Sequence, residues 1–240
     1  MSVVIWEKDE TVAIVKMNTA DNVQNLEFAD ALGKALDEVI ADETVTAIVL
    51  TSSNEKNFSL GVDINWVMGR MGESDNESIK KFMYGMNENF KKLLLLPVPT
   101  IAAINGHAFG NGAILSCACD FRFMREDRGY FCFPEVDLGI PFLPGMVALC
   151  KLAMPYYKYK ELKLTGKRAG AKELAEDHVI LKACSDSDTL MKESIAYAKT
   201  FTKKRGIFGE HKQRLNKHVS EIMKTEDPEY IEPINLFVQD

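Results

Sequence analysis

The chain has 240 residues, of which 46% are hydrophobic and 27% charged, a composition typical of a globular protein. That length allows one sizeable domain, with or without a small appendage. The formal net charge of -6 argues against a general nucleic-acid binder, and no apolar run is long enough to cross a membrane. The N-terminus carries no secretion signal, so we expect a cytoplasmic protein. Five cysteines without a CxxC pair favour buried thiols in a reducing compartment over a metal site.

The predicted elements begin with a β-hairpin over residues 3–6 and 11–17 and an amphipathic helix over 26–40. A buried parallel strand over 44–50 comes next, and the polar segment 68–76 is predicted to be a mobile loop. The rest of the chain alternates strands and helices before it becomes mostly helical. Strands are predicted over 98–102, 120–124 and 130–133, and helices over 77–96, 113–119, 144–154, 156–164, 171–175, 187–203 and 207–224. This order predicts an α/β core over 1–185 and a C-terminal helical region over 186–240.

A glycine-rich turn at residues 103–112 separates a buried strand from a small-residue helix. Gly106, Gly110 and Gly112 allow a tight turn and a close approach of another group. The first N–H groups of the following helix then point at that group, which favours a bound anion or an oxyanion. The spacing fits neither the dinucleotide fingerprint nor a P-loop, so glycines that serve packing alone remain the alternative.

Two further segments follow predicted strands in the same way. Residues 57–64 form a second strand-to-helix turn, and Pro134-Glu135 follows a third strand. One N–H group from each of the two turns can point at one carbonyl oxygen, which is the arrangement of an oxyanion hole. The Glu135 carboxylate then lies beside that oxygen, although an exposed carboxylate at a strand end is the alternative reading of Glu135.

Five blocks of sequence resemble the enoyl-CoA hydratase/isomerase (crotonase) superfamily, in the family's order and spacing. They are residues 58–64, 104–112, 119–122, 134–140 and 164–168. The resemblance implies a spiral of ββα units with two nearly perpendicular sheets, and C-terminal helices that form trimers or dimers of trimers. It also implies an acyl-CoA thioester as ligand, with coenzyme A as part of the substrate and no separate cofactor or metal.

The resemblance also implies roles for individual residues. The oxyanion hole would be the backbone N–H groups of Val62 and Asn111, with Glu135 as the catalytic acid and base. The ligand would lie close to Gly110 and along the turn in residues 58–64. The turn just before the helix at 26–40 would close its other side. The residues implied for this binding are Ser59, Leu60, Asp63, Ile64, Asn25 and Leu26.

The reaction that the resemblance implies depends on the number of acids. Hydratases of the family carry a glutamate where this chain has Ile114, and a second one at Glu135. One carboxylate beside an oxyanion hole can move a proton from C2 to C4 of a 3-enoyl thioester, so a Δ3-Δ2-enoyl-CoA isomerase is expected. The alternatives are hydration with Asp137 as helper, decarboxylation or another enolate reaction, and a non-catalytic acyl-CoA-binding protein.

Several other side chains have two readings. His107 is expected to pack at the turn, and the Asn111 side chain either reaches the thioester or fills space. Cations at 70, 91 and 92 either meet CoA phosphates or lie on solvated helix faces, and methionines at 68 and 71 either line an acyl pocket or pack. The chain departs from the family at Asp177-His178, where a glycine is usual, and its last helix is expected to be short.

Overall fold

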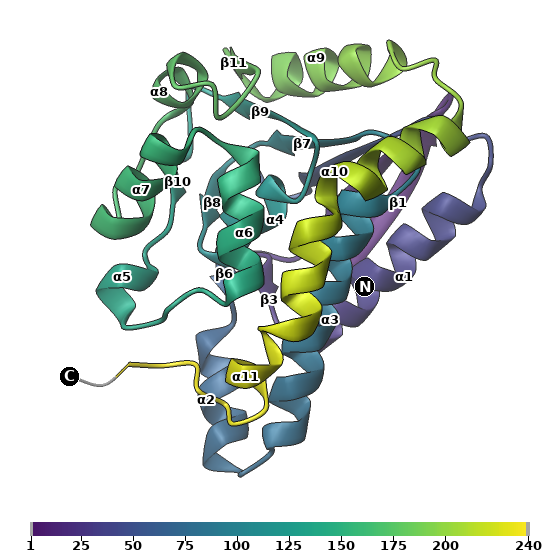
Figure 1. Ribbon diagram of the computed structural model, residues 1–240. Coiled ribbons are helices and arrows are strands. Elements are labelled where there is room, and N and C mark those ends of the chain that lie inside the picture. The colour runs from purple at the N-terminus through teal and green to yellow at the C-terminus, as the bar shows by residue number, and fades with distance from the viewer. Residues whose placement is uncertain (1, 239–240) are drawn as a thin grey trace.

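A computed structural model describes residues 2–238 and divides most of the strands between a large and a small parallel sheet (Figure 1). The large sheet has the order β1-β2-β4-β7-β9-β11, and only the β1–β2 hairpin is antiparallel. Its strands are β1 Val4–Asp9, β2 Val12–Met17, β4 Ala47–Ser52, β7 Thr100–Ile104, β9 Phe121–Arg125 and β11 Lys182–Cys184. The small sheet has the order β10-β8-β5, from Phe131–Cys132, His107–Phe109 and Asn57–Ser59. A third pair joins β3 Val23–Gln24 to β6 Gly61–Val62 in parallel.

Successive turns of the chain repeat one unit. Each of β4, β7 and β9 enters the large sheet, a strand of the small sheet follows, and a helix then returns the chain. These helices are α2 Ile64–Gly72 and α3 Asn76–Leu95 after β5 and β6, α4 Asn111–Cys117 after β8 and α5 Glu135–Leu138 after β10. The first helix, α1 Leu26–Ala41, follows the hairpin and β3 in a similar way. This is the predicted ββα spiral, and it brings the carboxyl ends of the small-sheet strands to one edge.

The central strands of the large sheet are buried on both faces because their residues alternate between two cores. Ile48 and Leu50 belong to the main core, which contains residues of α1 and α3, whereas Ala47 and Val49 face α9 Ser187–Lys199. Figure 1 shows α9 lying along the sheet, and α10 Arg205–Thr225 running beside α3.

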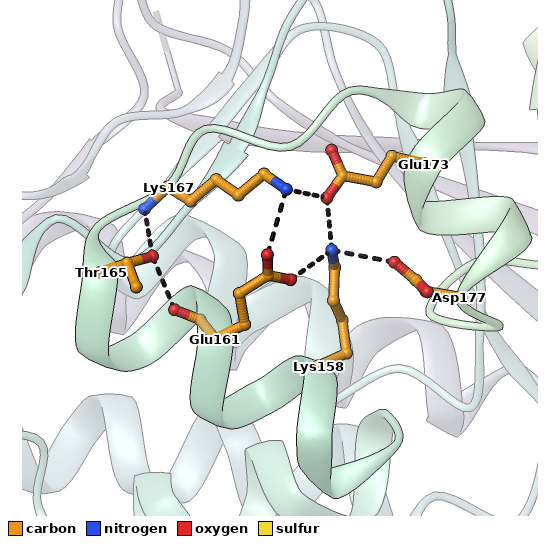
Figure 2. A network of polar contacts seen from close by, with 6 residues as sticks. All are labelled: Lys158, Glu161, Thr165, Lys167, Glu173 and Asp177. Carbon is orange, nitrogen blue, oxygen red and sulfur yellow. Dashed lines mark hydrogen bonds and ion pairs between the residues drawn. The ribbon is translucent and has the colours of Figure 1, made fainter.

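The remaining helices are α6 Pro144–Ala153, α7 Tyr156–Thr165, α8 Ala171–Glu176 and α11 Pro228–Ile231. A charge network joins α7 to α8 (Figure 2). Lys158 is only 5% exposed. Its ammonium group pairs with Glu161 at 2.7 Å, with Asp177 at 2.8 Å and with Glu173. Lys167, which follows α7, also pairs with Glu173 on α8, at 2.6 Å. The Glu173 carboxylate therefore binds two lysines and ties the two helices together. No helix within residues 2–238 is long and apolar enough to cross a membrane.

The predicted helices are present, with ends shifted by a few residues, but two predictions were wrong. The expected loop at 68–76 is largely helix α2, because the Asp63 carboxylate caps its first turn at 3.0 Å from Trp66 N, and Gly69 lies within the helix rather than breaking it. The first strand continues through Lys8 and Asp9, which were expected in the turn; the chain turns instead at Glu10, whose φ is 54°. At the departure noted above, His178 has φ 56°, a conformation that glycine adopts without strain.

Candidate active site

Three chain segments meet at the edge where β5, β8 and β10 end. Because these strands are parallel neighbours, the segments that follow them are side by side: Leu60–Val62 after β5, Gly110–Asn111 after β8, and Pro134–Glu135 after β10. Gly110 N donates to Cys132 O at 3.0 Å, which fixes the β8 and β10 ends against each other. Sequence reasoning predicted this convergence of two turns and one carboxylate, and the structure shows it.

Glu135 faces Gly110 directly. A Cβ atom added at Gly110 would lie 2.7 Å from Glu135 Oε1, and Gly110 has φ 53°, so only glycine fits here without strain. The other carboxylate oxygen, Oε2, is buried and has no hydrogen-bond partner within residues 2–238. Burial, which leaves Glu135 8% exposed, raises its pKa to about 7. The alternative of an exposed carboxylate at this position is therefore wrong.

Lys163 on α7 moderates this effect. Its ammonium nitrogen lies 3.4 Å from the centre of the Phe142 ring, and its positive charge lowers the pKa of Glu135 against the larger effect of burial. Burial in turn lowers the pKa of Lys163 itself. A cation near the carboxylate thus keeps part of the glutamate ionised near neutral pH.

The first two segments bring two backbone N–H groups to this edge. Asp63 N donates to Gln24 O on β3, and since successive N–H groups of a strand point in opposite directions, the Val62 N–H points away from β3. Gly61 has φ 83°, and a Cβ there would lie 3.0 Å from Asn111 N. Asn111 begins α4, where N–H groups have no acceptor within the helix.

A cavity of about 120 Å³ opens beside these groups and is lined almost entirely by apolar side chains. Among the described residues that line it, Glu135 carries the one titratable side chain. Ile114, at the position where the resemblance would place the second glutamate of a hydratase, is part of the apolar lining. The apolar wall includes Met83, Phe142, Met146, Leu236 and Phe237. Val238 N donates to Gly139 O at 2.9 Å, and residues on both sides of Gly139 line the cavity, so the C-terminal tail is attached beside it. Figure 1 shows this tail running from α11 toward the side on which α5 lies.

The residues predicted to bind the ligand or to form the oxyanion hole fall into two groups. Leu60, Val62, Ile64, Gly110 and Asn111 line the cavity. The other four do not line it: Ser59 and Asp63 use their side chains in internal hydrogen bonds, Asn25 caps α1 at 3.1 Å from Phe28 N, and Leu26 borders a separate surface depression with Arg70.

The side chains with two readings are mostly structural. Lys91 pairs with Glu88, Lys92 pairs with Asp37 at 2.6 Å, and Arg70 pairs with Glu73 at 3.0 Å. Neither Met68 nor Met71 lines the cavity. The Asp137 side chain is exposed and faces Gly166 rather than the cavity. His107 packs edge-on against Phe109 with ring centres 5.0 Å apart, as expected of a residue that packs at the turn.

Sequence reasoning missed Gln24, which lies between the predicted hairpin and the first predicted helix. Gln24 is fully buried, and its Oε1 accepts a hydrogen bond of 2.6 Å from Asn111 Nδ2. A two-residue strand has too few positions to show an alternating pattern, so only an isolated amide before the first helix marked this site. Lys163 was missed because a lysine on a predicted helix normally lies in solvent.

Comparison with known proteins supports the resemblance. A family model described as enoyl-CoA hydratase/isomerase matches residues 7–232. Enoyl-CoA delta isomerase 3 of Arabidopsis thaliana is 33% identical over 63% of this chain, and enoyl-CoA delta isomerase 2, peroxisomal, of the same plant is 34% identical over 64%. The matches span 64% and 65% of those two proteins, just under two thirds of their length. Short-chain-enoyl-CoA hydratase of Clostridium acetobutylicum is 33% identical over 78% of this chain and 70% of its own.

Solved structures show the same fold. The crystal structure of enoyl-CoA hydratase from Bacillus halodurans superposes with a TM-score of 0.88 and 21% identity, covering 99% of this chain and 96% of that one. That of an enoyl-CoA hydratase/isomerase from Mycobacterium paratuberculosis has a TM-score of 0.82 and 22% identity, covering 97% and 92%. The expected crotonase-type fold is thereby confirmed.

Proposed function

The chain belongs to the enoyl-CoA hydratase/isomerase family, and on that premise we propose that it is a Δ3-Δ2-enoyl-CoA isomerase with Glu135 as its single acid and base. The observation that carries the proposal is the cavity itself. Among the described residues that line it, one side chain is titratable, and it faces Gly110 directly among apolar walls. A double-bond shift needs one group that takes a proton and returns it, and it needs no water.

The reaction would proceed in two proton transfers. The Glu135 carboxylate takes a proton from C2 of a 3-enoyl thioester, and the electron pair of that C–H bond moves into a dienolate. The Val62 and Asn111 N–H groups donate to the thioester oxygen as its negative charge develops. Glu135 then gives the proton to C4, so the double bond ends between C2 and C3 and no atom is gained or lost. A base with a pKa of about 7 suits both transfers near neutral pH.

Hydration is the second candidate, and one observation favours it besides the matching hydratase. Asn111 Oδ1 and Glu135 Oε2 both belong to residues that line the cavity, and both are buried without a hydrogen-bond partner in the described chain. Two such acceptors suit a water molecule that hydrates a 2-enoyl thioester. Ile114 opposes this reading, because the position offers no second carboxylate to activate that water.

A paired assay separates these functions. Purified wild type receives a 3-enoyl-CoA in one reaction and a 2-enoyl-CoA in the other, and Glu135→Gln receives the same. Formation of the conjugated 2-enoyl thioester, lost by several orders of magnitude in the variant and without hydration, supports the isomerase. Hydration of the 2-enoyl thioester contradicts it, and binding without either reaction supports a binding protein.

Asp137→Asn is the matched control, since it removes a carboxylate two residues away that is exposed and faces Gly166. We expect it to keep wild-type turnover. A loss comparable to that of Glu135→Gln would contradict a mechanism with one base.

We further propose that the chain assembles as a homotrimer or a dimer of trimers. Helices α6, α7 and α10 expose large apolar side chains, with Leu152 at 52%, Tyr157 at 84% and Leu215 at 72% exposure. Contact with further copies would remove this surface from water. Sedimentation equilibrium tests it, and a monomer at micromolar concentration would contradict it.

A further inference from the structure

One buried residue, Gln24, contacts both segments that carry the proposed oxyanion-hole donors. Its main chain pairs with Val62 in the β3–β6 register, and its side chain bonds to Asn111 at the start of α4. Gln24 is fully buried and does not line the cavity, so it touches no substrate directly.

The main chain of Gln24 sets the direction of the Val62 N–H. Gln24 O accepts a hydrogen bond of 2.9 Å from Asp63 N, so the N–H of the residue after Val62 points toward β3. The Val62 N–H itself is therefore left on the opposite side, toward α4.

The side chain of Gln24 fixes the other donor. Asn111 Nδ2 donates to Gln24 Oε1 at 2.6 Å, and this is the one hydrogen bond that the Asn111 side chain makes among the described residues. Gln24 Nε2 donates to Ser59 Oγ at 3.1 Å, and that hydroxyl accepts from Gly61 N at 3.2 Å. A continuous chain of buried hydrogen bonds thus joins Asn111 to the residue before Val62.

We propose that Gln24 is a positioning residue that holds the Asn111 N–H in register with the Val62 N–H. The inference rests on the proposed function, because it gives the two N–H groups their role. The alternative is a structural amide that stabilises the fold without influencing the reaction. Small displacements of oxyanion donors reduce turnover more than binding, because the donors act chiefly on the charge that develops during reaction.

Gln24→Met tests the proposal, since methionine has a similar length but forms neither hydrogen bond. Its kcat on a 3-enoyl-CoA is expected to fall about 10- to 100-fold while KM stays within about twofold. A chromophoric thioester, 4-dimethylaminocinnamoyl-CoA, supplies a second readout: donors at its carbonyl oxygen shift its absorption to longer wavelength, and the shift should shrink in the variant.

Asn89→Leu is the matched control. Asn89 is also a buried amide, and its Nδ2 donates at 2.8 Å to Ala29 O, between α3 and α1 and away from the cavity. We expect it to lower the melting temperature but to keep kcat and the spectral shift. If Gln24→Met does not fold, Asn111→Ala breaks the same bond from the other side. If Gln24→Met does fold, the double variant with both Gln24→Met and Asn111→Ala should lose no more kcat than the more impaired of the two single variants.

The outcomes are distinct. An unchanged kcat and spectral shift in Gln24→Met, or in Asn111→Ala if the former does not fold, overturns the positioning role. A rise in KM with kcat retained overturns it as well, because it indicates a change in binding alone. A wild type that neither isomerises the substrate nor shifts the probe contradicts the proposed function itself.

Discussion

Glu135→Gln should stabilise the protein at alkaline pH while it abolishes the reaction. The pKa of Glu135 is raised from 4.5 to about 7, mainly by burial. Below pH 4.5 the carboxyl is protonated in both the folded and the unfolded chain, so it costs nothing. Between the two values the unfolded chain loses the proton and the folded chain keeps it, so the free energy of unfolding falls as pH rises. Above pH 7 both are ionised and the full cost, about 3 kcal/mol, is present.

Glutamine has the shape of the neutral acid and carries no such cost. Thermal unfolding of wild type and Glu135→Gln is compared at about pH 4 and about pH 8.5. The variant should melt about 5 to 10 °C higher at the alkaline pH and show little difference at the acidic one. Glu176→Gln, at an exposed position, is the control and should change neither. A stabilisation equal at both pH values, or none at the alkaline pH, would refute the argument that burial raises this pKa.

Three further changes have defined outcomes. Lys163→Met removes the cation that lowers the Glu135 pKa, so the acidic limb of the kcat/KM profile should move to higher pH, whereas an unmoved limb would show that the charge does not reach the carboxylate. Gly110→Ala places a Cβ 2.7 Å from Glu135 Oε1 at a φ of 53°, and turnover should fall about 100-fold, while Gly206→Ala, with nothing within 4 Å, serves as its control. Lys158→Met leaves three carboxylates without their buried partner and should lower the free energy of unfolding by about 2 to 3 kcal/mol in urea titration, a result that an unchanged midpoint would contradict.

The sequence predicted the part of the site that depends on order along the chain. Glu135 follows β10 and Asn111 follows β8. These two strands are parallel neighbours, so they end at the same edge of the sheet. This consequence of topology does not require knowledge of side-chain packing. The long helices α1, α3 and α10 were likewise predictable, because each repeats an apolar face over many residues.

The rest depends on contacts between segments far apart in the chain. Gln24 and Asn111 are 87 residues apart, and neither residue type announces a buried amide pair. The two-residue strands β3 and β6 exist only because they pair with each other, so no local propensity marks them. The C-terminal tail reaches the cavity by a hydrogen bond to Gly139, which residue spacing along the chain does not indicate. The cytoplasmic location, the domain boundary at 185 and the absence of a cofactor stay predictions.

The same burial governs both the stability and the chemistry of this site. An apolar wall around Glu135 withholds water from the carboxylate, which costs folding free energy at alkaline pH and raises the pKa toward the value that a proton shuttle needs. Ile114 extends that wall where an acid would have admitted water, and Lys163 limits how far the pKa rises. With one carboxylate among the described residues that line it, and with the two N–H donors that we propose, we infer that the site suits proton transfer within one substrate better than addition of water to it.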